Sequence, residues 1–141
     1  QLWDRILLTG RRCWGFCVPD HSAGSGDWGG RSLLVVGDQI ERECLKAYRD
    51  GSFYGCLTGR GPYVESFEAS PTSIDIALTE PAEIRFIADA QVAATVTGDR
   101  ATFAVPQKAG APDVVYARVE VQHVSGERLF LQPVRYGARA S

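Results

Sequence analysis

The spacing of apolar residues changes once along the chain, near residue 52, and this change limits the folds that the sequence can adopt. Before it, apolar residues recur with helical spacing or in short continuous runs; after it, they alternate with polar residues in the two-residue period of half-buried strands. The sequence therefore predicts an α+β chain, with a short α/β segment followed by an antiparallel β-module. We place the two parts at residues 1–62 and 63–141.

The first part contains two helical patterns and two strand-like runs. Apolar residues share one helix face over 1–9 and again over 38–51, where Asp38 is a candidate amino-terminal cap. The runs 13–18 and 32–36 are almost continuously apolar. This pattern is typical of strands covered on both faces, as in a parallel sheet.

The second part lacks a helical period. Alternating runs at 73–78, 83–87 and 117–121 predict strands. Turn signals rich in glycine, proline and acidic residues separate them, at 80–81, 97–99, 110–112 and 125–127. Short strands without intervening helices predict an antiparallel β-sandwich of immunoglobulin-like type.

The composition narrows the classes of partner. A formal net charge of -2 gives no electrostatic reason to expect nucleic acid or an anionic membrane, and no apolar run approaches the roughly 18 residues that would span a bilayer. The cysteines lie among apolar residues, which favours reduced, buried thiols and slightly favours the cytoplasm; they are Cys13, Cys17, Cys44 and Cys56. Because the chain starts at Gln1 and contains no methionine, we expect it to be a piece of a longer protein.

One cluster suggests chemistry. Asp20 and His21, with Asp27 nearby, directly follow the apolar run 13–18 in a loop rich in glycine. A carboxylate and an imidazole at the carboxyl end of a strand are groups that α/β barrels use to hold a metal ion. The same residues also suit an aspartate that caps a turn and a histidine bonded to nearby backbone. The residues alone leave both interpretations open.

Two further segments carry residues of chemical interest. The sequence Thr-Gly-Arg-Gly-Pro at 58–62 resembles a phosphate-binding loop, but it lacks the lysine of such loops and opens no helix, so we predict a turn between the two parts. His123 ends the strand predicted at 115–123. Because a Ser-Gly turn follows it, we expect it to be exposed and without a partner. The sequence has no strand-serine-helix elbow, so it does not support Ser-His-Asp catalysis.

A series of motifs, taken in order, resembles the end of a PHP domain, the polymerase and histidinol phosphatase superfamily. The matching runs are Trp-Asp-Arg-Ile-Leu at 3–7, Gly-Arg-Arg-Cys-Trp-Gly-Phe at 10–16, Val-Pro-Asp-His at 18–21, the glycine-to-valine run 30–36, the helix and Gly-Ser-Phe-Tyr-Gly stretch at 47–55, and 58–62. The strands at 116–121 and 129–134 are similar to those of a β-module that many bacterial members append. The resemblance covers nearly the whole chain.

The resemblance implies a fold and an activity for a parent protein. PHP domains are distorted α/β barrels that bind up to three divalent metal ions, zinc, manganese or iron, and hydrolyse phosphate esters. Residues 1–62 would be the end of the barrel, and Asp20 and His21 would match its last metal motif, in which one residue usually separates the two ligands. The family's earlier motifs, which begin with His-x-His, do not occur in this chain.

We therefore expect the carboxy-terminal part of a metal-dependent phosphoesterase. It would be inactive as an isolated chain and would bind no metal tightly, since a catalytic site needs more ligands than Asp20 and His21. Its partner would be the rest of the barrel domain, with a homodimer as another way to cover unpaired strands.

Two other classes remain open. One is a non-catalytic β-sandwich that binds a partner through an exposed apolar edge or patch. The other is a degenerate family member whose metal site has been lost. Sequence upstream of Gln1 that contains His-x-His would favour the phosphoesterase.

Overall fold

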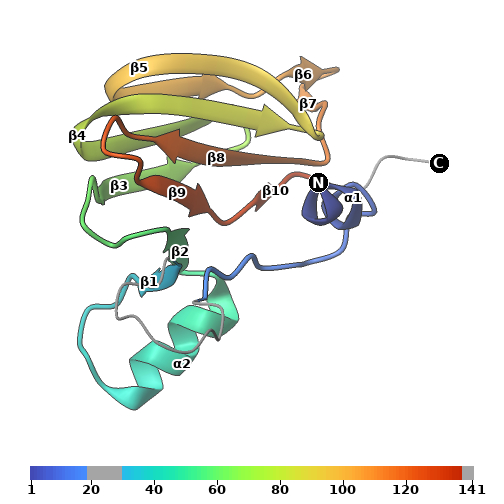
Figure 1. Ribbon diagram of the computed structural model, residues 1–141. Helices are drawn as coiled ribbons and strands as arrows, with labels where there is room; N and C mark the ends of the chain where they lie inside the picture. The colour runs from blue at the N-terminus through green and yellow to red at the C-terminus, as the bar shows by residue number, and fades with distance from the viewer. Residues whose placement is uncertain (19–29, 138–141) are drawn as a thin grey trace.

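The computed structural model describes residues 1–18 and 30–137, which form a mostly β protein with two short helices (Figure 1). The elements are α1 (Leu2–Leu7), β1 (Arg31–Leu34), α2 (Glu41–Asp50), β2 (Phe53–Cys56), β3 (Val64–Ala69), β4 (Ser73–Ala88), β5 (Gln91–Ala104), β6 (Gln107–Lys108), β7 (Ala111–Pro112), β8 (Tyr116–Gln122), β9 (Arg128–Leu131) and β10 (Val134–Arg135).

The strands form one antiparallel sheet that curls into a half-barrel. Its order is β1-β2-β9-β8-β4-β3, with β5 paired to β4 and β10 paired to β8, while β6 and β7 form a separate small hairpin. β4 connects β3 to the rest of the sheet, because its first half pairs with β3 and its second half pairs with β8. The predicted antiparallel β-module is confirmed at this level.

β4 and β5 form a long hairpin with a two-residue turn. Ala88 pairs with Gln91, so Asp89 and Ala90 alone make the reversal, with φ of 47° and 67°. Positive φ at both central residues defines the type I′ turn, whose twist matches that of the flanking strands. The Asp89 carboxylate accepts the backbone N–H of Val115 at 2.8 Å, which ties the turn to the start of β8.

The hairpin kinks in its middle. Ala77 pairs with Arg100 and Ala82 pairs with Gly98, so four residues of β4 lie opposite the single residue Asp99. The turns predicted at 80–81 and 97–99 fall at this kink, and the prediction that the chain reverses there was wrong. Pro81 and Gly98 interrupt the ladder locally, as in a bulge, and pairing resumes on the other side.

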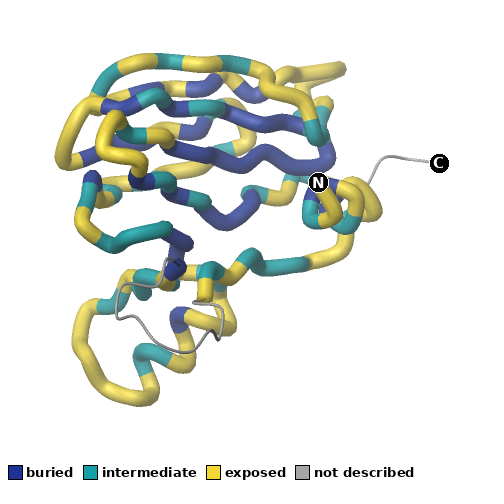
Figure 2. The backbone as a smooth tube through the Cα atoms, in the orientation of Figure 1, coloured by how far each residue is buried: buried dark blue, intermediate teal, exposed yellow. Residues whose placement is uncertain are grey.

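The curl encloses the larger of two cores in the described part of the chain. Its buried members come from both halves of the hairpin and from the strands around it, as the dark blue segments of Figure 2 show. The larger ones are Tyr54, Ile74, Ile76, Leu78, Ile84, Phe86, Phe103, Val119, Val121, Leu129 and Leu131. Phe86 and Phe103 stack with ring centroids 5.2 Å apart, one from each arm of the hairpin.

The helices of the first part lie where the sequence predicts them. α2 ends at Gly51, which takes the left-handed conformation with φ of 76° and donates its amide to Ala47. The predicted cap was wrong, because the residue before the first turn is Ile40 and no side chain caps the helix.

The predicted parallel strands are not present. The run at 32–36 becomes β1, which is antiparallel to β2, and residues 13–18 form no strand. Phe16 and Val18 are 53% and 68% exposed, so an apolar run did not mark a strand covered on both faces.

β2 links the first part to the second. It pairs with β9 on its other side, and its Tyr54 and Cys56 belong to the main core. The sheet is therefore continuous across residue 62.

Candidate functional site

The predicted metal ligands Asp20 and His21, together with Asp27, lie outside the described residues. The residues that flank this segment are described, and they are in contact. Gly30 donates its amide to Leu57 at 2.6 Å, and a Cβ on Gly30 would lie 2.7 Å from the carbonyl oxygen of Val18. Gly30 also has φ of +104°, which a side chain would disfavour. Val18 and Gly30 thus lie against each other beside the end of β2.

Polar side chains take the place of a strand neighbour for residues 13–18. Gln132 accepts the amide of Gly15 at 2.8 Å and donates to the carbonyl of Gly15 at 2.7 Å. The Ser32 hydroxyl accepts the Cys17 amide at 3.3 Å and donates to the Cys17 carbonyl at 3.0 Å. These four bonds fix the backbone before Val18 without a β-ladder.

Two glycines give this segment room to pack. A Cβ on Gly51 would lie 2.7 Å from the Trp14 ring, and a Cβ on Gly55 would collide with the Cys17 sulfur. Trp14 also donates its indole N–H to the carbonyl of Arg49 at 3.2 Å. The segment therefore lies against the end of α2 and against β2.

A buried ion cluster attaches α1 to β8. Arg118, 1% exposed, donates through its guanidinium to both oxygens of Asp4, at 2.9 and 3.1 Å. Tyr116 donates its hydroxyl to Asp4 at 2.7 Å, and the Trp3 ring lies 5.0 Å from the guanidinium. Burial would raise the pKa of Asp4, but the bonds from Arg118 and Tyr116 outweigh it and lower that pKa.

The other side of Arg118 is also neutralised. It pairs with Glu120, which in turn lies 3.6 Å from Arg128. Each charge of the cluster thus has a partner within it, so we interpret the cluster as structural. In the regular alternation of a half-buried strand, Arg118 and Glu120 would face solvent. The structure shows both buried, and α1, which carries Asp4 and Trp3, lies over Arg118.

The loop at 58–62 binds a carboxylate from its own chain. Glu127 accepts the backbone amides of Leu57, Thr58 and Gly59 at 2.8, 3.0 and 2.8 Å, and it also accepts the Thr58 hydroxyl. Burial would raise the pKa of Glu127, yet these bonds lower it to about 2. The Glu127 carboxylate thus occupies the anion-binding position that these backbone amides form. The segment 58–62 is a loop whose anion comes from its own chain.

The prediction for His123 was wrong. Its side chain is only 14% exposed, lies 3.5 Å from Glu80, and has Nδ1 2.8 Å from the Ser125 hydroxyl. Ser125 also donates its amide to Nδ1, at 3.3 Å. The serine and the histidine sit in one turn, and Glu80 joins this turn to the kink of β4. Bonds of this local kind are typical of a turn stabilised by its own side chains.

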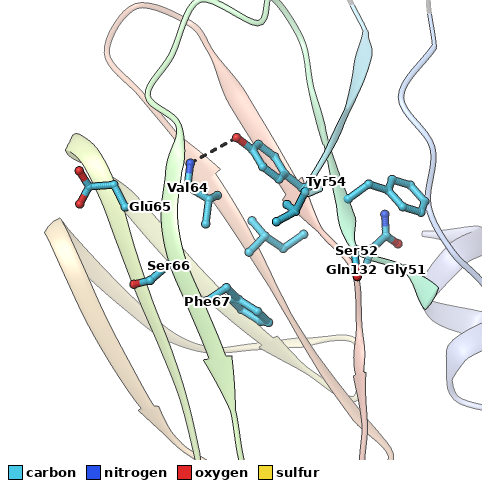
Figure 3. Close-up of a pocket in the computed structure, with 11 residues that line it drawn as sticks. Gly51, Ser52, Tyr54, Val64, Glu65, Ser66, Phe67 and Gln132 are labelled. Atoms are coloured by element: carbon cyan, nitrogen blue, oxygen red, sulfur yellow. Dashed lines mark hydrogen bonds between the residues drawn. The ribbon is translucent and has the colours of Figure 1, made fainter. Parts of the chain in front are cut away.

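A cavity of about 300 Å³ lies between β2, β3 and β9, at the open seam of the half-barrel (Figure 3). Val64 and Phe67 of β3 line the space, and the Phe67 ring points into it, while Glu65 points away. The Tyr54 hydroxyl accepts the Val64 amide at 3.3 Å and so connects the two sides of the seam. Apolar side chains from three strands and the amide of Gln132 line the space.

A bulge in β3 produces this lining. Val64 pairs with Leu78 and Ser66 pairs with Ala77, so Glu65 is an extra residue in β3. Residues three apart in an unbroken strand face opposite sides. The bulge therefore turns both Val64 and Phe67 into the cavity, which no alternating pattern in the sequence indicates.

Within residues 1–18 and 30–137, no three histidine, cysteine or acidic side chains gather in a way that could hold a metal ion. No helix of these same ranges is long and apolar enough to cross a membrane.

Fold and site together define a mostly antiparallel β protein with a curled sheet, a seam cavity and an attached helical segment. No protein-family model, no curated protein and no solved structure matches the chain.

Proposed function

We propose that the chain is the carboxy-terminal part of a metal-dependent phosphoesterase of PHP type. Residues 1–62 would complete the α/β catalytic domain, and the residues from 63 onward would form an accessory module of immunoglobulin-like type. The order of motifs from residue 3 to residue 62 supports the family. The distribution of exposed apolar side chains supports a further domain that covers residues 1–62 in the parent protein.

Uncovered apolar residues concentrate in the first part. Of the eleven large apolar side chains that are exposed among the described residues, eight lie before residue 50. These are Leu2, Leu8, Phe16, Val18, Val35, Ile40, Leu45 and Tyr48. Such a concentration marks a surface that another part of a protein covers.

α2 shows the same feature within one element. Its apolar stripe predicts burial, yet Leu45 is 55% exposed and Ala47 is the only buried residue of the helix. β1 beside it pairs with β2 alone in the described part of the chain. A layer over α2 and β1 is what the rest of a barrel domain would supply.

In the parent protein, Asp20 and His21 would provide two ligands for a divalent ion, zinc, manganese or iron. A carboxylate oxygen and an imidazole nitrogen are suitable donors for these ions. The bound metal would polarise the phosphate ester and activate a water molecule. Val18 and Gly30, which flank the segment and lie against each other, would fix where these ligands leave the scaffold. The remaining ligands would come from the barrel.

The seam cavity favours a second candidate, a non-catalytic binding module. Its volume lies at the lower end of the roughly 300–1,000 Å³ typical of small-molecule sites. Its lining of mainly apolar side chains with a few polar groups resembles that of such sites. This candidate predicts ligand binding that is independent of metal and of His21.

The test uses the whole protein encoded by the natural reading frame. We expect hydrolysis of a chromogenic phosphodiester with manganese, and His21→Ala should reduce turnover by roughly 100-fold or more, since even indirect metal contacts are worth about 10–100-fold. Bound metal, counted by elemental analysis, should fall in the same variant. Lys108→Ala, on the β6–β7 hairpin, serves as the matched control.

The isolated 141-residue chain should show no turnover and no tight binding in a zinc titration. Full metal content and full turnover in the whole protein carrying His21→Ala would refute the proposal. Turnover by the isolated chain that His21→Ala abolishes would also refute it, because the chain would then be a complete enzyme.

A further inference from the structure

β5 forms a long free edge of the sheet. It extends over 14 residues from Gln91 to Ala104 and pairs with β4 alone in the described structure (Figure 1). Val92 is 60% exposed, and no charged residue occurs before Asp99. Sheets usually protect such edges with charges, proline or short length. β5 has only the adjacent pair Asp99 and Arg100, in its middle.

For the second half of β5, after the kink, the pairing with β4 shows which way the backbone N–H and C=O groups point. Val105, just after the strand, donates its amide to Thr72, which precedes β4. In an antiparallel ladder the residues face alternate sides, so Phe103 and Ala101 also face β4. The amides and carbonyls of Thr102 and Arg100 therefore face outward.

The direction of the backbone groups in the first half of β5, before the kink, follows in the same way. Asp89 donates its amide to Tyr116, so alternate residues of β4 face β8 and those between them, such as Ile84, face β5. Ile84 pairs with Val96, which places Val96 toward β4. The backbone groups of Thr95 and Thr97 consequently face outward.

We propose that β5 pairs with β5 of a second copy of this chain, antiparallel, about a two-fold axis between Asp99 and Arg100. In this register Asp99 lies opposite Arg100 of the second copy, and this pair occurs twice. Neither residue takes part in an ion pair or side-chain hydrogen bond within the described ranges. Opposite charges across a strand pair stabilise it, and like charges destabilise it.

Two further features agree with the same register. The outward backbone groups of Thr97 meet those of Thr102, as a ladder requires. The half-buried Val96 meets the buried Phe103, so inward-facing apolar side chains adjoin on one face of the paired sheets.

The agreement depends on the kink at 98–100. Residues 96 and 103 are an odd number apart, so in a regular strand they would face opposite sides. The irregular pairing around Asp99 shifts the alternation by one residue and brings both side chains inward. An isologous contact with these pairs is therefore available to this kinked strand and not to a straight one.

This inference does not rest on the phosphoesterase proposal. An edge-to-edge contact buries less surface than a standard interface, so we expect a weak dimer that depends on concentration. Light scattering of the full 141-residue chain should show a mass that rises from 15.4 kDa toward twice that value.

Charge reversal tests the register. Arg100→Asp and Asp99→Arg each place like charges opposite one another at two positions, and each should weaken dimerisation by about 10-fold or more. The double variant Asp99→Arg/Arg100→Asp restores opposite charges and should restore dimerisation. Arg42→Asp on the exposed side of α2 makes the same charge change elsewhere and should leave the dimer unchanged.

The double variant keeps the test independent of misfolding, because rescue requires two folded chains. Concentration-dependent protection of the Thr97 and Thr102 amides in hydrogen exchange should accompany the dimer. A monomer at every concentration would overturn the proposal. A dimer that responds equally to all four variants, or that the double variant fails to restore, would overturn it as well.

Discussion

Glu127 is a buried carboxylate that holds two distant segments in place. Its bonds join the turn between β8 and β9 to the loop that follows β2, and its side chain is almost fully buried. The pKa of about 2 lies below the ordinary value of 4.5, so folding favours the ionised form. This stabilisation is complete above pH 4.5 and is lost as the pH falls from 4.5 through 2.

We predict that Glu127→Gln lowers the free energy of unfolding by about 3 kcal/mol at pH 7. This is the free energy that corresponds to the difference between the ordinary and the lowered pKa of Glu127. The neutral amide also presents an N–H group to backbone donors, which leaves them unpaired. Urea titrations at pH 7 and at pH 3 measure the effect, and the difference from the unsubstituted chain should shrink at the lower pH. Glu68→Gln on the exposed face of β3 is the control. A difference that stays constant with pH would contradict the assignment.

Ala90 is a second residue whose effect on the free energy of unfolding can be measured. It has φ of 67° in the type I′ turn, where glycine is normally found. We predict that Ala90→Gly raises the free energy of unfolding by about 1 kcal/mol, because the left-handed conformation disfavours a Cβ. Ala109→Gly, at φ 51° in the β6–β7 turn, should act in the same direction but affects only that small hairpin. Destabilisation by Ala90→Gly would show that the turn differs from type I′.

At the scale of single elements, periodicity predicted the helices and the long runs of β4 and β8. The hairpin of β4 and β5 was missed because its turn, Asp89 followed by Ala90, lacks the glycine that marks a type I′ reversal. Pro81 and Gly98 instead suggested reversals within the strands. Local signals of this kind cannot distinguish a bulge from a turn, since both need the same residue types.

The candidate site depends even more on tertiary structure. Gln132 and Glu127 act on residues far away in sequence, Gly15 and the loop 57–60, and no local pattern announces such bonds. The alternation of β8 indicated one solvated face, yet α1 covers Arg118. The seam cavity exists because of a bulge at Glu65 and the closure of β2 on β9. Only the Asp20 and His21 prediction came from sequence, and it stays a prediction.

For the molecule as a whole, the position of β2 decides how the chain can be divided. A boundary at residue 62 predicts that the part after it folds alone, whereas β2 places Tyr54 and Cys56 in the main core and covers the edge of β9. A boundary at residue 62 and a core that includes β2 therefore predict different stabilities for fragments of the chain.

We predict that a fragment of residues 53–137 is more stable than one of residues 64–137 by at least about 3–5 kcal/mol, the usual cost of removing a large buried side chain. The shorter fragment also loses the amides of residues 57–59 that bind Glu127, which adds to the difference. Both fragments lack Asp4, so the loss of the ion cluster cancels in the comparison. Urea unfolding followed by circular dichroism measures the difference. Equal stability of the two fragments would support the boundary at residue 62.

The close packing of Cys17 on Gly55 has a consequence for how sequences like this one can diverge. Any side chain at position 55 would enter the space that the sulfur occupies, and it could be accommodated only if position 17 became smaller or the segment moved away from Ser32. A substitution at either position alone should therefore destabilise the packing, whereas compensating substitutions at both positions can be tolerated. Covariation between residues 17 and 55, together with the similar pair 14 and 51, would be the evolutionary signature of this docking.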